Sequence, residues 1–235
     1  MRSALPVVAA AAAILLVFVS AASAAPVASA QGMLQAEYLY GAPANLELAD
    51  LVDRPRLLGT THVQFQDAAT GERRLTGYAD AVAVYDLPLE SLVAVASDFE
   101  SYPSFLPRIL EATILAHDGP IWRVSYNVGI RFLGVQVSYR SVFDTVVERL
   151  EGGAVGVRSW QVRSLDDGLY ESYSSFYFEP VLVRGKTMCL VRYFNRPGLR
   201  RPGFGVLQVL DLFTPPEARA QVAAIAGEAR RRASR

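Results

Sequence analysis

Cysteine and histidine are scarce in this chain of 235 residues, which has one of the first and two of the second. Cys189 has no partner within the chain for a disulfide, and the apolar stretch 188–191 around it is typical of a buried thiol. His62 and His117 fall in no metal-binding or catalytic-triad spacing. The sequence therefore predicts neither a disulfide framework nor a metal site.

An excess of charge of either sign is also lacking, with 23 basic residues against 23 acidic ones. Proteins that bind nucleic acid carry a marked basic patch or stripe, so we expect no nucleic-acid partner. The chain has no Gly-x-Ser-x-Gly elbow, no His-x-x-x-His pair and no glycine-rich phosphate loop. We therefore expect no cofactor, while the oligomeric state stays open.

The first thirty residues have the composition of an export signal. Arg2 precedes a run rich in alanine, valine and leucine, and small residues follow. Both 22–24 and 28–30 read Ala-Ser-Ala, so cleavage after Ala24 and cleavage after Ala30 stay open. An uncleaved anchor is the alternative, because residues 4–25 are just long enough to span a bilayer. We expect a signal peptide at 1–30 and a protein exported to the periplasm or outside the cell.

The remaining chain suits one domain, because about 205 residues bury roughly 70% of the surface that their unfolded form exposes. Residues 31–57 begin with alanine, glycine and proline in no clear period, which favours an N-terminal extension or linker outside the core. We place the domain itself at residues 58–235.

The first part of this domain predicts a hairpin and two helices. Alternating residues at 61–67 and 75–85 flank a turn at Gly71. Pro88 then opens a helix that ends near Asp98, since proline loses no hydrogen bond in a first helical turn. Two prolines four residues apart, Pro103 and Pro107, leave room for only a short helix after it.

Turn sequences at 117–120, 151–153 and 166–168 mark out a series of strands. A change of alternation between Val157 and Trp160 indicates a bulge, and Arg196-Pro197-Gly198 is expected to end the sheet. The predicted strands are residues 122–130, 135–147, 155–163, 169–178 and 186–195.

A helical stretch closes the chain. Apolar residues at helical spacing predict a helix over residues 206–213. Thr214-Pro215-Pro216-Glu217 matches a capping box with proline at the first helical position, so a second helix is expected to start there. Arginines at 230–232 complement the dipole at its end.

This order of elements resembles the START-like superfamily, and within it the polyketide cyclase and coenzyme-Q-binding branch. The resemblance covers residues 75–232 and is carried by 83–92 (Ala-Val-Tyr-Asp-Leu-Pro-Leu-Glu-Ser-Leu) and 98–107 (Asp-Phe-Glu-Ser-Tyr-Pro-Ser-Phe-Leu-Pro). It implies an α+β helix-grip fold, in which a curved antiparallel sheet wraps around a long C-terminal helix. An elongated apolar cavity between them would hold a lipid, quinone, sterol or polyketide.

Aromatic and apolar side chains from the strands, the short helix and the C-terminal helix are the candidate ligand-binding residues. Each can instead complete the core, because aromatic residues dominate core burial in any fold. The candidates are Tyr102, Phe105, Trp122, Tyr126, Tyr139, Trp160, Phe176, Leu207, Leu210 and Phe213.

Polar candidates are few. Asp98 is expected to serve a helix end rather than to act as a general base, and Glu171 and Glu179 are expected to face solvent. Two arginine groups, at 196–201 and 230–232, would either attract anionic lipid headgroups in a transient membrane contact or be solvated.

The leading hypothesis is a non-enzymatic binder or carrier of a hydrophobic small molecule. Two rivals stay open: a cyclase or dehydratase that uses the same cavity, and a protein-interaction module whose cavity has closed.

Overall fold

A computed structural model describes residues 40–132 and 135–235 of the chain. The expected signal peptide, residues 1–30, lies outside the described residues. Export therefore stays a prediction.

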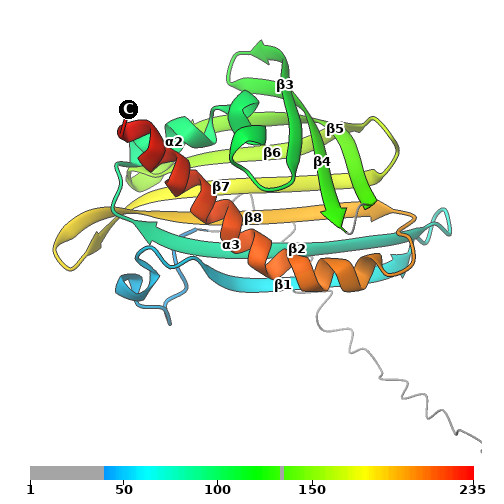
Figure 1. Ribbon diagram of the computed structural model, residues 1–235, viewed down its shortest axis with the longest axis horizontal. Helices are drawn as coiled ribbons and strands as arrows, with labels where there is room; N and C mark the ends of the chain where they lie inside the picture. Colours follow the sequence, from blue (N-terminus) through cyan, green and yellow to red (C-terminus); the bar gives the residue numbers. More distant parts are fainter. Residues whose placement is uncertain (1–39, 133–134) are drawn as a thin grey trace, which may run out of the picture.

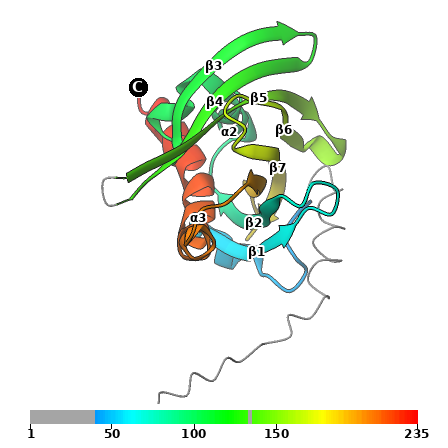
Figure 2. The same cartoon turned by 90° about the vertical axis from the view of Figure 1, so that its right-hand side faces the viewer.

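The described chain forms one eight-stranded antiparallel sheet, curved but not closed (Figures 1 and 2). Neighbouring strands follow the order β1-β2-β8-β7-β6-β5-β4-β3, so β1 and β3 are its edges. The strands are β1 (Arg56–Gln66), β2 (Arg73–Tyr85), β3 (Ile109–Asp118), β4 (Ile121–Phe132), β5 (Val135–Arg149), β6 (Val155–Ser164), β7 (Leu169–Val183) and β8 (Lys186–Arg200).

Helices cover the concave side and one end of this sheet. The long helix α3 (Val206–Ala233) starts beside β1 and ends beside α2 (Leu89–Ala96), and Figure 2 shows it lying across the open side of the curve. Short 3₁₀ helices are η1 (Leu48–Leu51), η2 (Phe99–Ser104) and η3 (Glu151–Gly153). The predicted hairpin, the five predicted strands and the helix-grip architecture are confirmed.

The main core lies between α3 and the concave face of the sheet. The part of α3 after Pro216, which we call its inner half, packs there; the part before Pro215 is its outer half. Val222, Ile225 and Ala226 of α3 are fully buried in this core cluster, which also holds three alanines of β2, at 79, 81 and 83. Alanine at three successive inward positions lets the helix approach the strand closely. Burying a valine or isoleucine side chain contributes roughly 1.5–3 kcal/mol, so this contact anchors the helix.

Residues 48–52, just before β1, lie against the core rather than outside it. Leu51 is fully buried in a second cluster with Val82 and Val84 of β2 and Tyr177 of β7. Val52 also forms a parallel bridge with Val84. Alternation sends these β2 valines to the face opposite the alanines, and that apolar face needs cover.

α3 corrects one expectation, because it continues through Pro215 and Pro216 instead of restarting there. Proline offers no N–H to the carbonyl four residues back, so Asp211 and Leu212 receive no such helical bond. Both residues are exposed to solvent, so water can hydrogen-bond to their carbonyls. Figure 1 shows that the helix changes direction along its length. Thr214 caps no helix; its hydroxyl contacts His62.

The strands hold three further differences. β8 does not end at residues 196–198 but runs on to Arg200. The β2–β8 hydrogen-bond ladder is interrupted between the pairs Thr76↔Gly198 and Ala79↔Asn195, so the N–H that Pro197 lacks is not needed there. The bulge of β6 lies at Val162 rather than between Val157 and Trp160. The sequence analysis assigned no range to β3, whose register shifts at Leu110 and Leu115 break its alternation.

Candidate ligand cavity

A cavity of about 550 Å³ separates the outer half of α3 from the concave face of the sheet. Its inner end meets the core at Tyr102, Tyr126 and Tyr193. Its outer end, the mouth, lies at the loop before α3, where Phe204 lines the opening and is fully exposed. Small-molecule sites in proteins range over about 300–1,000 Å³ and are mostly apolar, so this cavity has the size of one.

Four of the ten predicted site residues line the cavity: Tyr102, Tyr126, Tyr139 and Leu210. They come from η2, β4, β5 and α3, elements far apart in the sequence that the fold brings together. Tyr102 stacks on Tyr126 with ring centroids 6.0 Å apart, and its hydroxyl donates to the Ala96 carbonyl at 2.5 Å. Burial raises the pKa of both phenols, which therefore stay protonated.

Three of the other predicted residues pack inside the core around the cavity. Trp122 lies against His117 and Phe99, with ring centroids 3.6 and 5.9 Å away. Phe176 packs on Tyr193 at 4.9 Å, and Phe105 packs on the outer edge of Tyr102 at 5.8 Å. These three support the cavity wall without lining it.

The last three lie elsewhere. Trp160 points to the opposite face of the sheet, because side chains alternate along a strand and its neighbour Ser159 lines the cavity. On that face the Arg158 guanidinium lies 5.5 Å from the centre of the Trp160 ring. Leu207 joins a small apolar cluster beside the mouth. Phe213 is half-buried on α3 away from the cavity lining.

An ion pair that the sequence analysis missed spans one cavity wall. Arg108, after η2, pairs with Glu217 of α3, and both line the cavity. Burial raises the pKa of Glu217 to about 7, against the opposing effect of Arg108. Next to this pair, the Gln221 amide donates to the Pro107 carbonyl at 3.1 Å. Together these contacts join the helix to the η2–β3 connection.

His62 reaches the cavity from β1, although the sequence analysis placed it in no site. Asp211 accepts a hydrogen bond from its Nδ1 at 2.7 Å, because a carboxylate can only accept. In the tautomer that carries its proton on Nδ1, Nε2 accepts from the Thr214 hydroxyl, 3.3 Å away. Gly77, directly opposite in the β1–β2 register, makes this possible: a Cβ there would lie 2.4 Å from the ring. A glycine inside a strand was the available signal.

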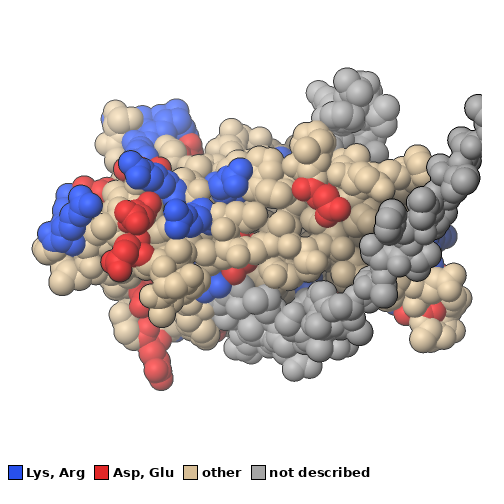
Figure 3. Space-filling view, turned by 90° about the horizontal axis from the view of Figure 1, so that it is seen from below, with Lys and Arg blue, Asp and Glu red and all other residues tan. Residues whose placement is uncertain are grey.

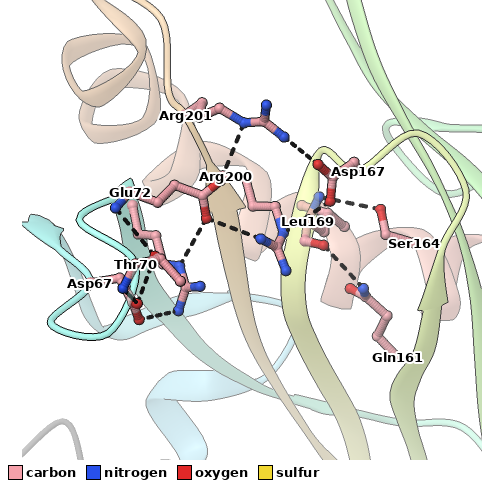
Figure 4. A network of polar contacts seen from close by, with 10 residues as sticks. Asp67, Thr70, Glu72, Gln161, Ser164, Asp167, Leu169, Arg200 and Arg201 are labelled. Carbon is pink, nitrogen blue, oxygen red and sulfur yellow. Dashed lines mark hydrogen bonds and ion pairs between the residues drawn. The ribbon is translucent and has the colours of Figure 1, made fainter.

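Ion pairs tie together three chain segments at the mouth end (Figure 4). Glu72, between β1 and β2, accepts from Arg74 at 3.2 Å, from Arg200 at 3.0 Å and from Arg201 at 3.2 Å. Asp167, in the β6–β7 turn, also pairs with Arg200 and Arg201. This network fixes the end of β8 from which the loop to α3 departs.

The two arginine groups, for which headgroup binding and solvation were the alternatives, are engaged in ion pairs. Arg196 pairs with Glu171, and Arg230 pairs with Asp53. Arg231 and Arg232 hold the pKa of Glu228 at about 2. Arg232 also binds Asp98 at 2.6 Å, which gives Asp98 the structural role expected of it. Figure 3 shows basic side chains gathered toward the C-terminal end of α3, away from the mouth.

Metal and membrane features can be judged for the described ranges only. Within residues 40–132 and 135–235, no three His, Cys, Asp or Glu side chains group as metal ligands would. In the same ranges no helix combines the length and apolarity needed to cross a membrane. Cys189 is buried there as predicted, and burial raises its pKa to about 12.

Solved structures of low sequence identity share this fold. The STAR-related lipid transfer protein (fragment 25–204) of Xanthomonas axonopodis has a TM-score of 0.53 at 14% identity, with 75% of this chain and 98% of that one covered. A protein of Thermus thermophilus gives 0.51 at 14%, covering 65% and 96%. Human StAR-related lipid transfer protein 5 gives 0.50 at 13%, covering 88% and 95%. No family model and no curated protein matches the chain. The chain has the START-like helix-grip fold.

Glu217 predicts a pH dependence of stability. Its folded-state pKa of about 7 lies above the ordinary value of 4.5, so between these pH values the folded protein keeps a proton that the unfolded chain releases. Stability from this group is therefore present below pH 4.5 and is lost as pH rises through 7. We expect the melting temperature of the wild type to fall from about pH 5 to about pH 8 relative to Glu217→Gln. The exposed Glu90→Gln is the control, and parallel curves for wild type and Glu217→Gln would refute the assignment.

Proposed function

We propose that this protein is an exported, non-enzymatic binder or carrier of a hydrophobic small molecule, which occupies the cavity between the sheet and α3. The cavity carries the proposal. Its volume of about 550 Å³ and its largely apolar lining suit a small molecule, whereas a closed protein-interaction module would have filled this space with side chains.

The fold supports a hydrophobic ligand. Two of the solved structures that share it are named as lipid transfer proteins, one bacterial and one human. At 13–14% identity the likeness concerns the fold, so the lipid, quinone or polyketide-like nature of the ligand is part of the proposal.

Ligand exchange would take place at the mouth, where a transient contact with a membrane surface is part of the proposal. Phe204 is fully exposed beside the opening. Apolar side chains at a surface favour contact with the boundary between headgroups and acyl chains. The paired arginines at the far end of α3 do not contribute to this contact.

A second candidate function is an enzyme of the cyclase or dehydratase kind, and the His62 arrangement favours it. An imidazole whose Nδ1 is held by a carboxylate presents Nε2 as a general base, and His62 lines the cavity. The Thr214 hydroxyl lies 3.3 Å from this Nε2, and a ligand hydroxyl can take the place of the Thr214 hydroxyl there.

Export predicts that the mature chain begins after Ala24 or after Ala30. N-terminal sequencing of the protein from the envelope or medium checks this. Recovery of the intact N-terminus from the membrane pellet would mean a retained anchor.

Cavity filling tests the carrier function. Leu210 lines the cavity, and Leu210→Trp adds bulk inside it; Leu212→Trp, on the exposed side of the same helix, is the matched control. Overpacking a filled core costs typically about 1–3 kcal/mol, whereas filling an open cavity costs less. We expect Leu210→Trp to lose uptake of a fluorescent lipid or quinone analogue with little change in melting temperature. No uptake by the wild type, with a sharp loss of stability in Leu210→Trp, would mean a closed cavity.

Compounds bound to the natively purified protein separate the carrier from the enzyme. Mass spectrometry of the extracted ligand makes the comparison. A carrier holds the same compound in the wild type and in His62→Gln. An enzyme accumulates an unconverted precursor in His62→Gln and in Asp211→Asn. Identical ligands in all three proteins would eliminate His62 as a general base.

A further inference from the structure

A row of polar side chains crosses the cavity floor at one level. Thr145, Ser159, Ser174 and Asn195 stand directly opposite one another on β5, β6, β7 and β8. Residues directly opposite in an antiparallel ladder project to the same face, so all four side chains point to the concave side. Ser159, Ser174 and Asn195 line the cavity. We call these four residues the polar row.

On its inner side the polar row borders an apolar part of the floor. The next row inward, in the same registers, consists of Val147, Val157, Phe176 and Tyr193, and these residues belong to the main core. Toward the mouth the cavity is lined by Leu169, Leu199 and Leu210. The polar row therefore lies part of the way along the cavity, between the apolar core and the leucines near the mouth, and Gln161 and Ser172 stand in the row next to it on the mouth side.

The polar row is part of a built site rather than a chance cluster of surface serines. Thr145 is completely buried, and its hydroxyl lies 2.8 Å from that of Ser159. In the adjoining row, toward the mouth, Gln161 projects to the same face, and its Oε1 is buried with no hydrogen-bond partner among the residues that the structure describes. Across the cavity, α3 contributes Thr214, Glu217 and Gln221. Both walls of the cavity thus carry polar groups.

Such a row discriminates between occupants. A buried hydroxyl or amide left without a partner costs about 1–3 kcal/mol, whereas one that exchanges water for a ligand oxygen gains on balance. Thr145 and Ser159 already bond each other, and Asn195 contacts the Tyr193 hydroxyl. A plain hydrocarbon chain would offer no partner to the remaining hydrogen-bonding capacity of Ser174 and Asn195, whereas a ligand oxygen at the same depth would.

We propose that the natural ligand is an apolar molecule with a hydroxyl or carbonyl group within its skeleton, and that the polar row binds this oxygen. This inference rests on the proposed binding function and names the class of ligand. An amphiphile whose only polar group is a terminal headgroup is the competing class.

Two esters that differ by a single hydroxyl test the proposal: methyl stearate and methyl 12-hydroxystearate. We expect the wild type to bind the hydroxylated ester about five- to tenfold more tightly, as one well-placed hydrogen bond allows. Displacement of a fluorescent apolar probe measures both dissociation constants. Ser174→Ala/Asn195→Leu should reduce the preference to less than twofold and leave methyl stearate binding equal or tighter.

Controls keep the outcomes distinct. Ser175→Ala, the next residue of β7 on the opposite face, should retain the wild-type preference. If the double variant fails to fold, Ser174→Ala alone should still reduce the preference at least twofold. Equal binding of both esters by the wild type would overturn the polar-row inference and leave the carrier standing. Binding of neither ester, nor of the fluorescent probe, would overturn the proposed function and this inference with it.

Discussion

The packing of the inner half of α3 against β2 is the contact on which the rest of the molecule depends. Three alanines on the concave side of β2 let Val222, Ile225 and Ala226 come close enough to be fully buried. A curved sheet has more concave surface than one helix can cover. The inner half of α3 therefore fills the curve of the sheet. The outer half, which precedes Pro215 and Pro216 in the chain, lies over the cavity. The cavity is the part of the concave face that the helix does not fill.

The outer half of α3 is attached by directional contacts instead of close packing. His62 bonds Asp211 and Thr214, and Arg108 pairs with Glu217. The ion pairs around Glu72 hold the end of β8 where the chain turns toward this half of the helix. Contacts of this kind do not require close packing, so they hold the outer half of the helix over the cavity without filling it.

Local sequence patterns were sufficient for most elements. Alternation predicted the strands, turn residues bounded them, and the motif at 98–107 carried the resemblance to the correct fold class. The pattern failed where a tertiary contact outweighed it. β3 lost its period to two register shifts, Pro197 is tolerated because a ladder pauses beside it, and α3 passes through two prolines where water can satisfy the exposed carbonyls. Leu51 is buried because the outer face of β2 needed cover.

What the sequence by itself determined is the set of elements and the apolar character of their faces, since period and turn chemistry are local properties. Only the tertiary structure decided which faces meet. One inserted residue at Val162 sets which β6 side chains face inward, and Trp160 faces away from the cavity. The polar row, the Arg108–Glu217 pair and the contacts of His62 join residues up to 152 positions apart. Strand register and the path of α3 bring these residues together. Neither is encoded in the spacing of any one segment, so the sequence pattern could not predict these contacts.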